Sequence, residues 1–129
     1  VKLPLNLVNP IEADALSNRN TFIRAWFDDA GLLMRFEKMV YGEVELALAN
    51  ASLYLEMTGH IVVAWIWLRQ ALVAVAKLPG AQGPEGDFYQ GKLAACAYFY
   101  RWELPRTRHQ NQLLNDLDRT CFEMQDAWF

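Results

Sequence analysis

Cysteine and histidine are scarce in this chain, which has only two of each among its 129 residues. Cys96 and Cys121 are too few for a disulfide scaffold, and no secretory signal pattern opens the sequence, so we expect a cytoplasmic protein. Cys96 lies in an Ala-rich apolar stripe, where a thiol behaves as an unreactive small hydrophobe, and we expect the same of Cys121.

A complete set of metal ligands is also missing. Glu56 and His60 stand four residues apart, a spacing that could place two ligands on one metal ion. Ferritin-like bundles need a Glu-x-x-His motif on each of two helices, and His109 is the one other histidine of the chain. We therefore expect no metal site.

An excess of basic residues is absent as well. The chain carries 12 basic and 15 acidic residues, a formal net charge of -3, so we expect no nucleic-acid partner. Proline is scarce and apolar residues make up 53% of the sequence, which indicates a folded chain rather than a disordered one. A Gly-rich phosphate loop, a CxxC pair and a serine elbow are all missing, and we assign no catalytic residue.

One long hydrophobic run is present, over residues 48–76, with apolar side chains on nearly every face of the predicted helix. Such a helix must be buried on several sides. Its window from Met57 to Ala76 has the length of about 20 residues that a membrane span needs. Arg69 lies inside it, however, and a central arginine costs on the order of 3 kcal/mol in a bilayer. We expect a buried helix and no transmembrane segment.

Helical periodicity dominates the first half of the chain, and strand signals are almost absent. Asn9 and Pro10 predict the start of a first helix that runs to about residue 38, with Tyr41 and Gly42 after its end. A second helix is predicted over residues 43–77. The apolar residues at helical spacing along the first helix are Leu16, Ile23, Trp26 or Phe27, and Leu33.

Proline and glycine concentrate over residues 78–87, which predicts a long loop, with Asp87 as the cap of a third helix. Pro105 removes a backbone donor, and we expect a kinked continuation of this helix rather than a stop. A shorter helix near residues 116–125 should leave Trp128 and Phe129 docked on the core. The apolar stripe of the third helix is Tyr89, Leu93, Cys96, Tyr100 and Leu104.

Together these patterns predict an all-α protein, an antiparallel helical bundle of three long helices plus a shorter C-terminal helix. Residues 1–129 are expected to form a single helical domain. Because the chain starts at Val1 with an extended lead-in, we expect it to be a fragment or a processed product.

The basic cluster of the chain lies in the C-terminal part of the third helix. Arginines there could hold phosphate or carboxylate through forked hydrogen bonds. The same cluster would also suit a solvated face that complements the helix dipole, or a subunit contact, and the sequence leaves these alternatives open. Its members are Arg101, Arg106, Arg108 and His109.

Three blocks of sequence carry a resemblance to a known family. They are ALANASLYLEMTGHIVVAWIWLRQAL (47–72), DFYQGKLAACAYFYRWELPR (87–106) and the closing QDAWF. They resemble the extra C-terminal helical domain of a bacterial acyl-CoA dehydrogenase subgroup, with 3-methylmercaptopropionyl-CoA dehydrogenase and its relatives as the most similar type. The resemblance covers about the last two-thirds of the chain. Met57, Thr58 and Gly59 stand where the family has an LFG-like tripeptide.

The resemblance implies a larger parent enzyme that oxidises the α,β C–C bond of an acyl-CoA thioester. In the family a glutamate base takes the α proton, FAD accepts the β hydride, and an electron-transfer flavoprotein reoxidises the flavin. These groups lie in the upstream dehydrogenase core, so the resemblance assigns no catalytic or cofactor-binding residue here. It implies FAD in the parent enzyme, no cofactor in this fragment, and a homo-oligomer.

Two roles then fit the domain. It could stabilise the oligomer and shape the entrance to the acyl-CoA channel, or Arg101, Arg106 and Arg108 could bind the phosphates of coenzyme A. A different class stays open beside them, a free-standing helical module that binds a partner helix or a small apolar ligand between its helices.

Overall fold

The computed structural model describes residues 10–40 and 44–129, and within these ranges the chain is helical and contains no strand. The prediction of an all-α protein is therefore confirmed. The main helices in chain order are α1 (Pro10–Val40), α2 (Val44–Leu48), α3 (Ala51–Lys77), α4 (Pro84–Tyr98), α5 (Arg106–Asn115) and α6 (Thr120–Glu123). Shorter segments are η2 (Leu78–Gly80), the π-helical η3 (Phe99–Glu103) and η4 (Asp126–Trp128).

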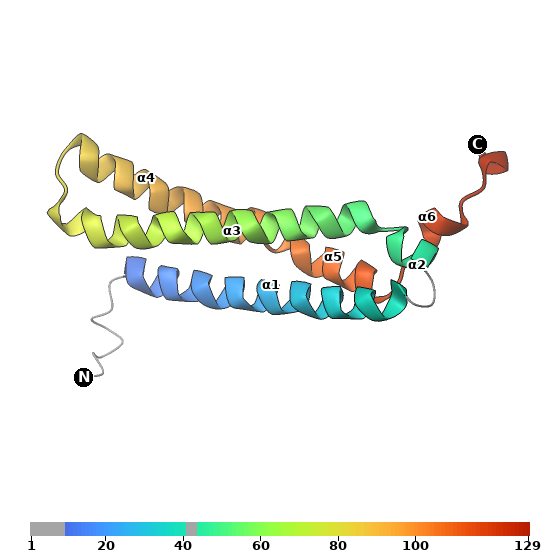
Figure 1. The fold of residues 1–129 in the computed structure, drawn as a ribbon. Coiled ribbons are helices and arrows are strands. Elements are labelled where there is room, and N and C mark those ends of the chain that lie inside the picture. Colours follow the sequence, from blue (N-terminus) through green and yellow to red (C-terminus); the bar gives the residue numbers. More distant parts are fainter. Residues whose placement is uncertain (1–9, 41–43) are drawn as a thin grey trace.

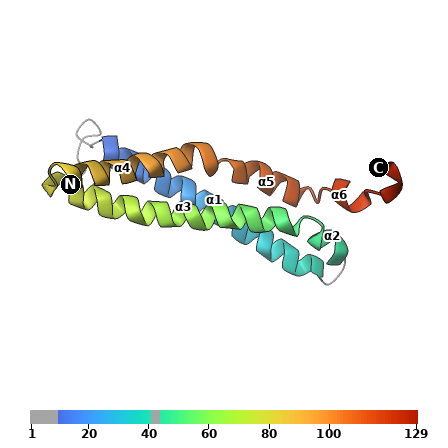
Figure 2. The same ribbon diagram turned by 90° about the horizontal axis from the view of Figure 1, so that it is seen from above.

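Three long rods form the bundle that the sequence predicted (Figure 1). Helices α1 and α3 run antiparallel, and the chain then turns back so that α4, η3 and α5 run along α3 in the opposite direction (Figure 2). Helix α3 contacts α1, α4 and α5 and is the central element. Thr58 of α3 donates a hydrogen bond to the Asp29 carboxylate of α1 at 2.7 Å. Arg35 Nη1 of α1 donates a hydrogen bond to Asn115 Oδ1 of α5 at 2.8 Å.

The core follows a single stripe of α3. Its buried residues recur every three or four positions, as one face of an α-helix requires. Tyr100 of η3 packs against this stripe, and its hydroxyl donates a hydrogen bond to the Ala64 carbonyl at 3.0 Å. The buried residues of α3 are Met57, Ile61, Ala64, Leu68, Ala71 and Ala74, and those packed with them from other helices are Ala25, Leu32, Cys96, Tyr100, Leu104 and Leu114.

The remaining faces of α3 are exposed in this chain, contrary to the expectation of burial on several sides. The neighbouring helices cover one side of α3, and Leu55, Trp65 and Leu72 are among the apolar residues left uncovered. The helical stretch Ala51–Gly80 is long and apolar enough to cross a membrane by length and composition. An 18-residue window within it has a mean hydropathy of 1.7, and 28% of that window is buried.

Helix α1 turns a different face to the core from the one that its large apolar residues predict. Ala25 and Leu32 are buried, whereas Phe27 is 70% exposed and the other described members of the expected stripe, Ile23, Trp26 and Leu33, are also exposed. The small Ala25 side chain lets the backbone of α1 approach α3, which the bulky Trp26 would prevent. The Leu16 side chain and residues Asn9, Tyr41 and Gly42 lie outside the described residues.

Two predicted helix boundaries are wrong. The expected helix over residues 43–77 is broken at Ala49 and Asn50, where the Asn50 side-chain amide donates a hydrogen bond to the Asp118 carbonyl at 2.9 Å. Helix α4 begins at Pro84, ahead of the predicted cap Asp87. Gly83 occupies the N-cap position with a φ of 55°, which favours glycine, and Pro84 needs no donor at the first helical position.

The kinked continuation at Pro105 is confirmed. The Leu104 N–H bonds the Phe99 carbonyl at 2.9 Å, a π-helical bond between residues five apart. Pro105 has no N–H and a ring that crowds the preceding turn, and the wider π turn accommodates both features. Leu104 and Pro105 keep right-handed helical backbone angles, and α5 begins directly after them, so the rod bends between η3 and α5 (Figure 2).

The end of the chain departs from the prediction. Helix α5 stops where Leu117 adopts a φ of 53°, and the Asp118 N–H bonds the Leu113 carbonyl at 3.2 Å, as in a Schellman-type helix end. The chain then leads away from the bundle through the short α6 (Figure 1). Trp128 and Phe129 are 63% and 96% exposed and do not dock on the core.

The core predicts a sharp contrast between two neighbouring apolar residues of α3. Met57 is fully buried and Leu55 is 73% exposed. We expect Met57→Ala to lower the free energy of unfolding by about 2–5 kcal/mol, because it leaves a cavity in the packed stripe. The matched control Leu55→Ala should change it by no more than about 0.5 kcal/mol. Urea unfolding followed by circular dichroism measures both, and equal losses would contradict this assignment of the core.

Candidate functional site

The predicted basic cluster lies where the third rod bends. Arg101 belongs to η3, Arg106 and Arg108 open α5, and all three side chains are exposed, as is His109. Arg106 Nη1 lies 3.3 Å from Glu103 Oε2, so this arginine forms an ion pair with that carboxylate. Arg101 and Arg108 form no ion pair with any described residue, so their charges are available to an anion.

Arg108 lies beside a second arginine that sequence analysis missed. Arg24 of α1 lines the same recess as Arg108, together with Asp28 and the two threonines Thr21 and Thr107. The recess measures about 30 Å³, so a phosphate group would lie across its mouth rather than inside it. Because 84 positions separate Arg24 from Arg108, no local sequence pattern predicts that they lie in one recess. The packing of α1 against α5 brings them there.

The predicted Glu56 and His60 pair is not a pair of side-chain ligands. His60 Nδ1 lies 2.9 Å from the backbone carbonyl of Glu56, and His60 Nε2 lies 3.6 Å from Glu103 Oε2. The histidine thereby joins α3 to η3, next to the Glu103 and Arg106 ion pair. In the part of the chain that the structure describes, no three His, Cys, Asp or Glu side chains gather as a metal site would require.

An apolar groove opens between α1 and α3, and we call it the α1–α3 groove. Its volume is about 480 Å³. It contains the large α1 residues that the sequence placed in the core, among them Trp26, whose ring centroid is 6.3 Å from that of Phe22. All of its described lining residues are aromatic or aliphatic: Phe22, Ile23, Trp26, Phe27, Val62 and Trp65.

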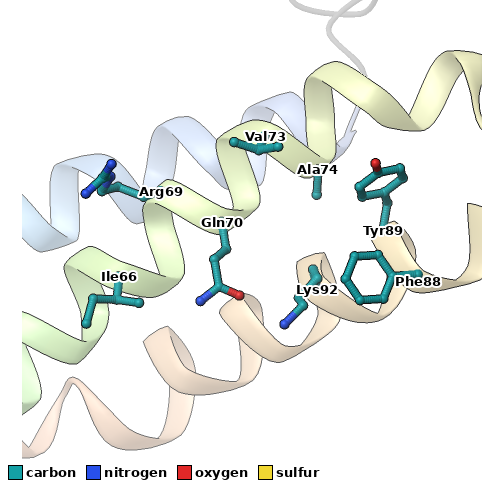
Figure 3. Close-up of a pocket in the computed structure, with 8 residues that line it drawn as sticks. All are labelled: Ile66, Arg69, Gln70, Val73, Ala74, Phe88, Tyr89 and Lys92. Atoms are coloured by element: carbon teal, nitrogen blue, oxygen red, sulfur yellow. The ribbon is translucent and has the colours of Figure 1, made fainter. Parts of the chain in front are cut away.

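A second groove, the α3–α4 groove, has a volume of about 470 Å³ and a mixed lining (Figure 3). The Arg69 guanidinium lies 5.2 Å from the Trp65 ring centroid, and Lys92 Nζ lies 5.4 Å from that of Phe88. Such cation–π contacts hold both charges over aromatic surface. Its lining residues are Ile66, Arg69, Gln70, Val73, Ala74, Phe88, Tyr89 and Lys92, none of them acidic.

The two cysteines differ in environment. Cys96 is buried, as predicted. Burial raises the pKa of its thiol to about 11. The Asn18 side-chain amide donates a hydrogen bond to Sγ at 3.9 Å, and this contact opposes part of the increase in pKa. Cys121 lies on α6 and is exposed, so the expectation that it resembles Cys96 is wrong. The reason is the early end of α5, which carries α6 away from the apolar core.

Comparison with known proteins identifies the family. Residues 22–125 match the family model described as acetyl-CoA dehydrogenase C-terminal like. The chain belongs to this family. It is also 33% identical, over 100 residues and 77% of its length, to a broad-specificity linear acyl-CoA dehydrogenase of Mycobacterium tuberculosis. The chain spans 16% of the length of that relative.

The family match covers nearly the whole described bundle. It begins at Phe22 in α1, includes α3, α4 and α5, and reaches Gln125 beyond α6. Both grooves and the basic cluster therefore belong to the C-terminal domain type of the acyl-CoA dehydrogenases. This result confirms the family that the three sequence blocks resemble.

The different environments of the cysteines predict selective alkylation. At pH 7.5 we expect iodoacetamide to modify Cys121 in the folded chain and to leave Cys96 unmodified. The thiolate of Cys96 becomes abundant only as the pH approaches its raised pKa of about 11, and its sulfur is also shielded. Peptide mass spectrometry distinguishes the two sites. Cys121→Ser should abolish labelling of the folded chain, and rapid labelling of Cys96 in that variant would contradict the prediction.

Proposed function

We propose that this chain is the C-terminal helical extension of a larger FAD-dependent acyl-CoA dehydrogenase, in which it packs on the dehydrogenase core or on a second subunit near the substrate entrance. The observation that carries this proposal is the family match over residues 22–125. The length of the relative supports it, because this chain corresponds to 16% of that protein.

The exposed apolar surface supports a packing role. The α1–α3 groove and the α3–α4 groove flank the central helix, and each lies within the range of about 300–1,000 Å³ that is typical of ligand-binding clefts. Contiguous apolar patches of this kind mark interaction surfaces in soluble proteins. A neighbouring domain or subunit would bury the exposed faces of α3 and α1, including Trp65 and Trp26.

The residues that line the two described grooves do not supply the carboxylate base that acyl-CoA dehydrogenation needs. The α1–α3 groove presents no hydrogen-bonding side chain except the indole N–H groups, and the α3–α4 groove has no carboxylate that could serve as a base. We therefore place FAD and the glutamate base in the rest of the parent enzyme. This domain carries no chemistry of its own in the proposal.

The parent enzyme would remove hydrogens from the α and β carbons of an acyl-CoA and pass electrons to an electron-transfer flavoprotein in the cytoplasm. We propose a substrate of the 3-methylmercaptopropionyl-CoA type on the basis of the sequence blocks, within fatty acid or related acyl-CoA metabolism. The Mycobacterium tuberculosis relative is a broad-specificity linear acyl-CoA dehydrogenase, which supports linear acyl chains as the alternative substrate class.

The intact mass and the visible spectrum of the natural gene product test the proposal. We expect a protein several times longer than this chain, yellow, and with the absorbance bands of a bound flavin, because the cofactor performs the hydride transfer. Addition of an acyl-CoA should reduce this flavin, because the substrate gives up its β hydride and is oxidised. A colourless product that begins near Val1 would overturn the proposal and favour the free-standing interaction module.

The basic cluster predicts a binding defect in the parent enzyme. If Arg101 and Arg108 hold the phosphates of coenzyme A, replacing each with alanine should raise the KM for acyl-CoA by about three- to tenfold, because charge-assisted hydrogen bonds are lost. The kcat should stay nearly constant. Arg106→Ala should have a smaller effect, since Glu103 already binds that side chain.

Steady-state kinetics with acyl-CoA measures both constants, and Arg19→Ala, which removes an exposed cation from α1, is the matched control. An equal fall in kcat and kcat/KM, or a KM unchanged from the control, would contradict phosphate binding and leave the packing role alone.

A further inference from the structure

We propose that the α3–α4 groove binds the tail of a second copy of this chain, residues 119–129, so that two copies exchange tails across a two-fold axis. The proposal rests on the shape, charge and position of the groove and of the tail. It does not depend on the flavin chemistry of the parent enzyme.

The tail is an apolar segment without cover. Trp128 and Phe129 are exposed, and Phe122 and Met124 expose part of their side chains as well. Both views of the fold show the tail leading away from the bundle (Figures 1 and 2). Aromatic side chains gain most from burial, about 150–250 Å² each, so this segment has a strong tendency to find an apolar surface.

The groove has the charge that the tail needs. Its two cations, Arg69 and Lys92, lie over aromatic rings and form no ion pair with any described carboxylate. The tail carries Asp126, two residues before Trp128, and none of the ion pairs among the described residues includes its carboxylate. Glu123, by contrast, is already paired with Arg119 at 2.7 Å. An indole seated in the groove would bring Asp126 beside one of the two cations at its rim.

The tail of the same copy is badly placed for this groove. Asn50 holds the Asp118 carbonyl at the start of α3, whereas the groove spans Ile66 to Ala74. That separation is 16 to 24 residues along α3, or about 24–36 Å of helix. Ten residues from Asp118 to Trp128 reach about 33 Å only when fully extended. Docking within one copy would therefore unfold α6 and η4.

A second copy solves this placement. When the bundle axis of one copy is reversed relative to the other, the tail end of each lies beside the groove end of its partner, and the contact is the same on both sides. Two aromatic anchors from each tail bury about 600–1,000 Å² in total. With the groove surface added, the contact reaches the roughly 1,200–2,000 Å² of a stable interface.

Photo-crosslinking within the full-length natural protein tests the exchange. We would place the photoreactive residue p-benzoylphenylalanine at position 128, mix isotopically light and heavy copies after dissociation and reassociation, and map crosslinks by mass spectrometry. The expected result is a light–heavy crosslink from position 128 to peptides that contain residues 66–74 or 88–92. Crosslinks within one copy only, crosslinks to other segments only, or no crosslink from the tail would each overturn the proposal.

Charge reversal tests the recognition itself. Arg69→Glu combined with Lys92→Glu should lower the yield of the light–heavy crosslink by about five- to tenfold, because two attractive contacts become repulsive. Asp126→Lys in the same chain should restore part of the yield. Arg19→Glu, an exposed arginine outside the groove, is the control and should leave the yield unchanged. If the Arg69→Glu and Lys92→Glu variant gave the same crosslink yield as the Arg19→Glu control, the proposed charge pairing would be overturned.

Discussion

The burial of one stripe of α3 against the other two rods is the constraint on which the rest of the structure depends. The stripe combines large residues such as Met57 and Ile61 with the small Ala64, Ala71 and Ala74. Small residues let the neighbouring backbones come close, and large ones fill the space between them. The same packing brings the Tyr100 hydroxyl to the Ala64 carbonyl, which satisfies the polar atom of an otherwise buried ring.

That stripe uses only part of the apolar surface of the helices. The apolar surface that remains on α1, α3 and α4 lines two grooves of similar volume and different chemistry. The α1–α3 groove is uniformly apolar and suits a packed protein interface. The α3–α4 groove has the cations Arg69 and Lys92 at its rim and suits an apolar segment that carries negative charge. One helical scaffold therefore offers two distinct surfaces for contact.

The bend at Pro105 and the helix end at Leu117 determine where α5 and the C-terminal tail lie relative to the bundle. The π turn before Pro105 keeps α4 and α5 in one rod, which places Arg108 beside Arg24 of α1. The left-handed conformation of Leu117 then releases the chain from the bundle. Cys121, Trp128 and Phe129 are exposed for that reason, although their residue types favour burial.

The sequence by itself determined the all-α class, the three long rods, the kink at Pro105 and the burial of Cys96, because helical periodicity and proline geometry are local properties. It also carried the family resemblance. Only the tertiary structure decided which face of α1 is buried, because Ala25 and Trp26 are neighbours and close packing selects the smaller one. Contacts between residues far apart in the chain also place Arg24 and Arg108 in one recess, form the two grooves and leave the tail exposed. No local pattern encodes such contacts.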